Sequence, residues 1–209
     1  MKKFVRILIG LAVLVALLVP LGAVSAQTWA SGFQLQNLGS ATAGITIKFY
    51  DSNTGAEVTA AQITDSIPAM QSKTYFAVSN SGLPASFAGS AVVTSDQDLR
   101  AIHNLYASSG GTWFASSAGY NAGASSVNMP LIMRNNSGFN TWFAVQNAGS
   151  APATVTVQFT AGTAGNNYTA PAVTIQPGAS KYFYQATEAN LGATFIGSAV
   201  ATAVGAPIV

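Results

Sequence analysis

His103 is the only histidine in this chain of 209 residues, which contains no cysteine. A serine activated by His103, with Asp96 or Asp98 orienting the imidazole, would resemble the catalytic group of a hydrolase. Serine is frequent throughout the sequence, and no Gly-x-Ser-x-Gly turn marks one serine as a nucleophile. Leu99, Ala101 and His103 alternate on one apolar strand face, which favours a structural histidine. We therefore expect no catalytic residue and no enzymatic activity.

Metal-binding patterns are also weak. One histidine without cysteine does not provide the usual zinc ligands. Asp51-x-Asn53-x-Gly55 resembles the start of a calcium loop, but no glutamate follows at the twelfth position. Asp96-Gln97-Asp98 is a second acidic group, at the end of an expected strand. A hairpin turn and solvated loop charges are the expected roles, so we predict no metal and no cofactor.

Aromatic residues are set among small ones in the stretch from 105 to 128, which is dominated by Gly, Ala, Ser and Asn. Trp113, Phe114 and Tyr120 are the candidate ligand-binding or partner-binding residues, because Trp and Tyr combine an apolar ring with a polar group. An exposed platform of this kind would bind a surface glycan or protein. The alternatives are a loop that packs its rings against a neighbouring domain, and simple disorder.

The elements that would position these residues occur twice. Gln36-Asn37-Leu38-Gly39-Ser40-Ala41 returns as Gln146-Asn147-Ala148-Gly149-Ser150-Ala151, and Gly89-Ser90-Ala91-Val92 returns as Gly197-Ser198-Ala199-Val200. The order is kept at a spacing of roughly 110 residues, which is longer than the units of solenoid proteins. This spacing indicates a tandem duplication of a whole domain. His103 has no counterpart in the second copy, which weakens a catalytic role further.

Both copies are predicted to be β-structure. Ile45, Ile47 and Phe49 alternate with more polar residues, and Val155, Val157 and Phe159 do the same in the second copy. Residues 72–76 match residues 180–184 as a second pair of strands, each following a proline turn. Several short strands with turns about every ten residues are typical of a β-sandwich.

A Gln-Asn-x-Gly turn, a strand of alternating Val or Ile, and a Pro-Gly-x-Ser turn into an aromatic strand resemble bacterial extracellular Ig-like domains of the cell-adhesion-related (CARDB) type. The second copy has this last turn as Pro177-Gly178-Ala179-Ser180, whereas the first has Pro68-Ala69-Met70-Gln71-Ser72. The resemblance implies two tandem Ig-like antiparallel β-sandwiches with spacer or adhesion roles. It carries no catalytic residues to this chain.

The N-terminus is expected to be a signal peptide. Lys2, Lys3 and Arg6 precede an apolar stretch from 7 to 19, and Val24-Ser25-Ala26 offers small residues for cleavage after position 26. An uncleaved membrane anchor is the alternative, although the apolar stretch is shorter than a bilayer span. Three of the eight basic residues lie in this leader, so the rest of the chain has five basic and six acidic residues. Nucleic-acid binding is therefore not expected.

The predicted order is a signal peptide (1–26), a first Ig-like repeat (27–104), a linker (105–128) and a second repeat (129–209). The second copy stops soon after the strand that ends near Thr202, without most of the last strand that residues 99–104 supply in the first copy. Either the shortened or truncated domain tolerates this difference, or a neighbouring chain supplies the strand by β-augmentation.

These patterns predict an exported, non-enzymatic structural or adhesive protein that is secreted or at the cell surface. Its expected partners are a second copy of itself or a surface glycan or protein, and no transmembrane segment is expected after cleavage. The alternative function is a carbohydrate-binding module that uses the aromatic residues of the linker.

Overall fold

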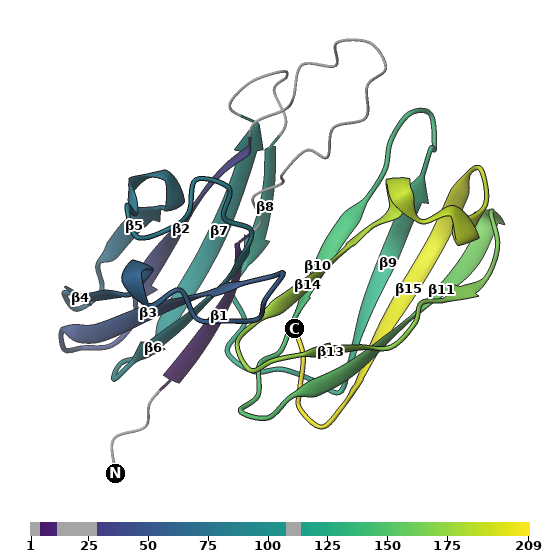
Figure 1. Ribbon diagram of the computed structural model, residues 1–209. Coiled ribbons are helices and arrows are strands. Elements are labelled where there is room, and N and C mark those ends of the chain that lie inside the picture. Colours follow the sequence, from purple (N-terminus) through teal and green to yellow (C-terminus); the bar gives the residue numbers. More distant parts are fainter. Residues whose placement is uncertain (1–4, 12–28, 108–113) are drawn as a thin grey trace. The chain divides into compact units, whose positions relative to one another are not determined.

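The computed structural model describes residues 5–11, 29–107 and 114–209, the first of these as backbone only. Their regular structure consists of antiparallel strands and four short 3-10 turns, with no α-helix among the described residues. This agrees with the all-β prediction. The chain divides into two compact units, Met1–Asn121 and Ala122–Val209 (Figure 1). Most of the expected signal peptide lies outside the described residues, but Val5–Leu11 forms strand β1.

The first unit has two four-stranded antiparallel sheets. One has the order β1-β6-β3-β4, formed by Val5–Leu11 (β1), Gly89–Ser95 (β6), Ala43–Asp51 (β3) and Ile63–Ile67 (β4). The other has the order β5-β2-β7-β8, formed by Ser72–Phe76 (β5), Trp29–Asn37 (β2), Leu99–Ala107 (β7) and Phe114–Ala118 (β8).

The second unit has a five-stranded and a two-stranded antiparallel sheet. The larger follows the order β12-β11-β15-β9, with β13 also paired to β11; its strands are Tyr168–Thr169 (β12), Ala153–Ala164 (β11), Phe195–Val204 (β15), Ser126–Arg134 (β9) and Val173–Ile175 (β13). The smaller pairs Trp142–Gln146 (β10) with Ser180–Tyr184 (β14).

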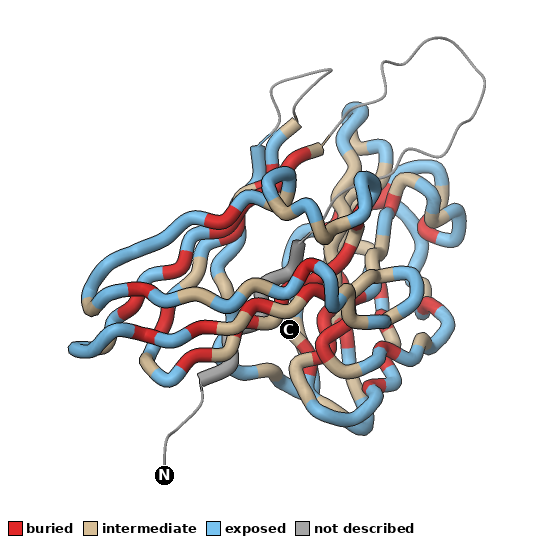
Figure 2. Tube along the Cα trace, turned by 60° about the vertical axis from the view of Figure 1, so that its left-hand side comes forward, coloured by how far each residue is buried: buried red, intermediate tan, exposed pale blue. Residues whose placement is uncertain are grey.

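Alternation of buried and exposed residues builds the core of each unit, as Figure 2 shows along the strands. In β3, Ile45, Ile47 and Phe49 are buried, and in β11, Val155, Val157 and Phe159 are buried. Their β-branched and aromatic side chains fit a pleated surface with one face against the core. In the first unit the buried cluster draws residues from both sheets, so the two sheets share one core.

The duplication is visible in the pairing of strands. Gln36 of β2 lies opposite Ser72 of β5, and Gln146 of β10 lies opposite Ser180 of β14. On the same basis β3 corresponds to β11, β4 to β13 and β6 to β15. Strand β9 pairs with β15 in the second unit, and β1 pairs with β6 in the first. Strand β9 therefore takes the position next to β15 that β1 takes next to β6.

The stretch from 105 to 128 has more regular structure than the predicted linker. Strand β7 extends to Ala107, β8 pairs with β7 over Phe114–Ala118, and β9 begins at Ser126. The boundary between the two compact units falls after Asn121, inside this stretch. Among the residues that the structure describes, no helix has the length and apolar character needed to cross a bilayer.

Candidate functional site

The three aromatic residues singled out in the sequence belong to the first unit. Trp113 lies outside the described residues. Phe114 begins β8 and is 68% exposed, and Tyr120, shortly after the strand, is 51% exposed. Strand β8 thus holds Phe114 at the edge of a sheet, where its pairing with Tyr106 of β7 fixes the backbone.

His103 lies on the inner face of β7, opposite Phe33 of β2, and is 5% exposed. Its Nδ1 is 3.5 Å from Ser117 Oγ of β8, and its Nε2 has no hydrogen-bond partner among the described residues. Burial lowers the pKa of His103 to about 4, so the imidazole is neutral at pH 7.

The two aspartates considered as partners of His103 are engaged elsewhere. Asp96 Oδ1 accepts a hydrogen bond from the backbone N–H of Gly44 at 2.9 Å. Asp98 forms an ion pair with Arg100 at 2.7 Å. The structure therefore does not bring His103 and these carboxylates together as a triad.

The acidic turn after β3 is closed by its own hydrogen bonds. Asp51 Oδ1 accepts from the backbone N–H groups of Asn53 and Thr54, each at 2.9 Å. Gly55 follows with a φ of 73°, a left-handed conformation that glycine adopts readily. The described residues contain no group of three or more His, Asp or Glu side chains that could hold a metal ion.

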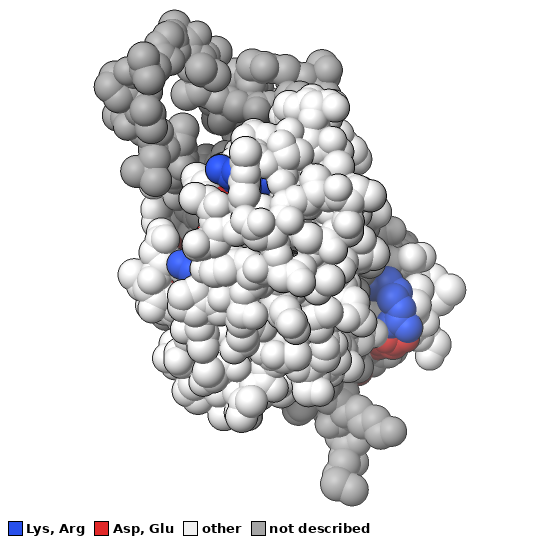
Figure 3. All heavy atoms as spheres, turned by 90° about the vertical axis from the view of Figure 1, so that its right-hand side faces the viewer, with Lys and Arg blue, Asp and Glu red and all other residues white. Residues whose placement is uncertain are grey.

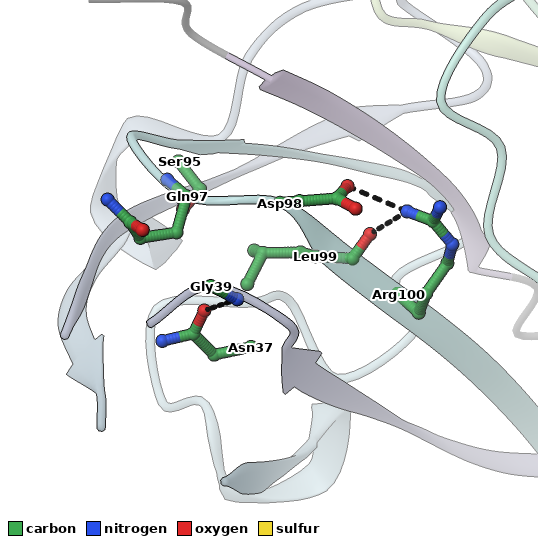
Figure 4. Close-up of polar contacts among 7 residues, drawn as sticks. All are labelled: Asn37, Gly39, Ser95, Gln97, Asp98, Leu99 and Arg100. Carbon is green, nitrogen blue, oxygen red and sulfur yellow. Dashed lines mark hydrogen bonds and ion pairs between the residues drawn. The ribbon is translucent and has the colours of Figure 1, made fainter. Parts of the chain in front are cut away.

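The asparagine of the repeated Asn-x-Gly motif connects the two sheets of each unit at one end. Asn37 is fully buried; its Oδ1 accepts from Gly39 N–H at 2.8 Å, and its Nδ2 donates to Ala41 O at 2.8 Å and Ile67 O at 3.0 Å. Figure 4 shows this turn beside the start of β7, where Arg100 pairs with Asp98. The asparagine thereby links the end of β2 to the end of β4 in the opposite sheet.

The second unit repeats this arrangement around Asn147. Its Oδ1 accepts from Gly149 N–H, and its Nδ2 donates to Ala151 O and Ile175 O, all at 2.8 Å. Ile208 is fully buried and bridges to Asn147, as Leu99 pairs with Asn37 in the first unit. The same motif therefore places Ile208 and Val209 beside the end of β10.

The outer side of β10, away from β14, is the candidate site, and we call it the β10 edge. Gln146 exchanges two backbone hydrogen bonds with Val209, at 2.9 and 3.0 Å. Because such groups alternate along an antiparallel strand, Ala144 and Trp142 direct their N–H and C=O groups to the same side. Among the described residues no strand pairs with them there. In the first unit, β7 covers the corresponding edge of β2 over its whole length.

The core beneath the β10 edge is less covered than its counterpart. Phe33 of β2 is 1% exposed, whereas Phe143, at the matching position of β10, is only partly buried. Phe143 stacks on Phe183 of β14, with ring centroids 5.2 Å apart. A strand added at the β10 edge would place alternate side chains on the inner face beside Phe143, as β7 does beside Phe33.

Sequence reasoning identified the short final strand but not the residues it leaves uncovered. Trp142, Phe143 and Ala144 carry no charge and no motif, so composition gave no reason to select them. A comparison of the two copies identifies them, because no described residue of the second unit takes the place of the β7 residues that pair with Gly32, Phe33 and Gln34.

A comparison of the chain with protein-family models, with curated proteins and with solved structures finds no match in any of the three.

Proposed function

We propose that this chain is an exported, non-enzymatic protein with a structural or adhesive role, secreted or at the cell surface, and built from two Ig-like β-sandwiches. Its partner is a second copy of the same chain, which adds a strand at the β10 edge. The observation that carries the proposal is that Trp142 and Ala144 have no strand beside them among the described residues, while β7 fills this place in the first unit. Unpaired strand edges are templates for pairing between chains.

The low charge of the second unit supports association between identical copies. Its sequence contains three charged residues, Arg134, Lys181 and Glu188. Figure 3 shows a face of the molecule on which few charged side chains are visible. Because like charges repel, a surface with so few of them opposes contact between copies only weakly.

Export would uncover a second edge. Cleavage after Ala26 removes β1 from the edge of β6, to which it is paired from Val5 to Leu11. Two open edges in different units would permit head-to-tail chains of copies. The N-terminal residue of the exported protein, determined by mass spectrometry, tests the cleavage; Gln27 is the expected result.

Sedimentation velocity of the purified protein over a wide concentration range tests association at the β10 edge. We expect a concentration-dependent increase in the sedimentation coefficient, and loss of that increase in Ala144→Pro. Proline removes the N–H that Ala144 directs away from β14, so the pairing within the unit is kept.

The matched control is Thr74→Pro, at the corresponding alternate position on the outer edge of β5 in the first unit. It should associate like the unmodified protein, and circular dichroism should show that both variants keep their β-structure. A protein that is monomeric at every concentration would contradict the proposal. So would an equal loss of association in both proline variants.

The second candidate function is glycan binding by the aromatic residues, and the exposure of Phe114 and Tyr120 favours it. Aromatic faces stack on the apolar faces of sugar rings. We expect binding on a glycan array to fall at least tenfold in Phe114→Ala and Trp113→Ala if this function holds. An array with no bound glycan would leave strand addition as the remaining proposal.

A further inference from the structure

The edge strands of this chain differ in how they are protected against pairing with other chains. Native proteins protect such edges with charged residues, with proline, or by keeping the edge strand very short. Strands β12 and β13 have only two and three residues. The charged residues and prolines of the longer edge strands are Arg6 in β1, Asp65 in β4, Lys73 in β5, Pro130 and Arg134 in β9, and Lys181 in β14.

Two edge strands among the described residues have none of these protections, and one lies in each unit. They are β8 (Phe114–Ala118) and β10 (Trp142–Gln146). The lack of charge extends around β8, because no Lys, Arg, Asp or Glu occurs between Arg100 and Arg134. The β10 edge therefore has a counterpart of the same kind in the first unit.

The pairing of β8 with β7 shows which of its backbone groups are open. Gly119 N–H donates to Ala101 O at 2.8 Å, so Gly119 and every second residue before it direct their N–H and C=O groups to β7. The residues between them, Phe114, Ser116 and Ala118, direct these groups away from β7. No strand in the described part of the chain pairs with β8 on that side, which we call the β8 edge.

Strand β8 contributes little to the core of its own unit. All five of its side chains are exposed, and its backbone is paired on one side. Sheets are stabilised mainly by side chains that pack on a common face, so a strand of this kind is held weakly. A partner at the β8 edge would supply a second ladder of hydrogen bonds.

The two open edges also match in the faces that they would join. Ser117 lies opposite His103 and is therefore on the inner face of its sheet, whereas Ser116 is on the outer face. In the second unit the ring of Phe143 contacts the buried core, so Ala144 is on the outer face. Residues that exchange hydrogen bonds across an antiparallel pair have their side chains on the same face. Pairing of the two edges would thus place a small inner residue of β8 beside Phe143.

We propose that β8 of one copy is the strand that pairs, antiparallel, with the β10 edge of another copy. This inference rests on the proposed strand addition at the β10 edge and names its donor. The backbone groups of Trp142 and Ala144 bond to those of the β8 edge, and Gln146 keeps its bonds to Val209. Because donor and acceptor strands belong to different units, the contact is head-to-tail and can repeat from copy to copy.

Mixtures of single-cysteine variants test this pairing, because the chain itself contains no cysteine. Opposed residues in such a pair have Cα atoms about 5.5 Å apart, a separation that a disulfide can bridge. In oxidised glutathione buffer, Ser116→Cys mixed with Ala144→Cys should give a disulfide-linked pair of copies, identified by mass spectrometry. The matched control is Thr74→Cys, on the outer edge of β5, which should give at least about tenfold less cross-linked product with Ala144→Cys.

Proline substitution tests the same edge without cysteine. Ser116→Pro removes an N–H from the β8 edge and keeps the pairing with β7. It should weaken association in sedimentation velocity at least about tenfold. Ser116→Ala keeps the N–H and should associate like the unmodified protein.

The outcomes separate this proposal from strand addition in general. Association that persists in Ser116→Pro, with equal cross-linking of Ala144→Cys to Ser116→Cys and to Thr74→Cys, would overturn β8 as the donor. Strand addition would then come from another edge, such as that of β6 after cleavage of the leader. A disulfide that forms within the Ser116→Cys/Ala144→Cys double variant but not between copies in the mixture would also overturn it. A protein that is monomeric at every concentration would contradict both proposals.

Discussion

His103 shows how burial decides the role of a single residue. The sequence favoured a structural histidine, and the structure places it on an inner strand face with its Nδ1 3.5 Å from Ser117 Oγ. Neutral at pH 7 and separated from Asp96 and Asp98, it acts as a core residue of the first unit. Its lowered pKa has a consequence for the stability of the first unit.

We expect the stability of the first unit to depend on pH through His103. The pKa of His103 is about 4 in the folded unit and about 6.5 in an unfolded chain. Between these values the unfolded state binds more protons, so the stabilising contribution is complete above pH 6.5 and is lost as the pH falls towards 4. The loss approaches about 1.4 kcal/mol per pH unit and about 3 kcal/mol in total.

Urea unfolding at several pH values, for the unmodified protein and for His103→Gln, measures this effect. The variant should be less dependent on pH between 6.5 and 4, because it has no imidazole to protonate. Asp65, whose pKa is lowered first by its hydrogen bond to Lys73 and then by Ser66 N–H, titrates below this window in both proteins. Parallel pH profiles of the two proteins would show that His103 is not the group responsible.

At the scale of the strand, the repeated Gly-Ser-Ala-Val sequence has a steric explanation. A Cβ on Gly89 of β6 would lie 2.1 Å from the carbonyl oxygen of Tyr50 in β3, and a Cβ on Gly197 of β15 would lie 2.1 Å from that of Thr160 in β11. Each would also collide with a phenylalanine two residues earlier in the chain. Glycine therefore allows an aromatic ring to pack over the centre of each strand pair.

We expect Gly89→Ala and Gly197→Ala each to lower the free energy of unfolding by about 2 kcal/mol or more, because the backbone contact cannot relax without shifting a strand. Gly44→Ala is the control, since a Cβ there meets only Asp96 oxygens at 3.9 Å. It should change stability by less than about 0.5 kcal/mol. Chemical denaturation compares the three variants, and equal effects in all of them would refute the steric explanation.

The strands themselves were largely predictable, and the exceptions have a common cause. Alternation located β3 and β11, because each has one face against its own core. Strand β8 was assigned to a linker because Phe114-Ala115-Ser116-Ser117-Ala118 shows no such alternation, and all five residues are exposed. Its existence depends on backbone pairing with β7 rather than on burial of its side chains.

The whole molecule consists of two units that each contain the same buried asparagine. Among the described residues, the side chains of Asn37 and Asn147 bond only within their own unit. Replacing either by alanine leaves buried backbone groups without partners, which costs about 2–4 kcal/mol. If the units unfold separately, each substitution should affect one unit and not the other.

Scanning calorimetry of Asn37→Ala and Asn147→Ala tests this separation. We expect each variant to lower the midpoint of a different transition, by several degrees per kcal/mol for units of this size. Asn53→Ala, in an exposed turn, should leave both transitions in place. A single transition that moves equally in Asn37→Ala and Asn147→Ala would mean that the two units unfold together.

The amino-acid sequence by itself determined the all-β class, the duplication and most strand positions, because these depend on short-range patterns of burial and on turns such as Asn37-x-Gly39. Only the tertiary structure decided which strand edges have partners in one copy and not in the other. Whether a residue such as Ala144 has a neighbouring strand depends on residues far away in the chain, as β7 shows for the first unit. The β10 edge and the β8 edge are defined by the strands that lie beside them, and pairing of this kind exists only in the folded chain.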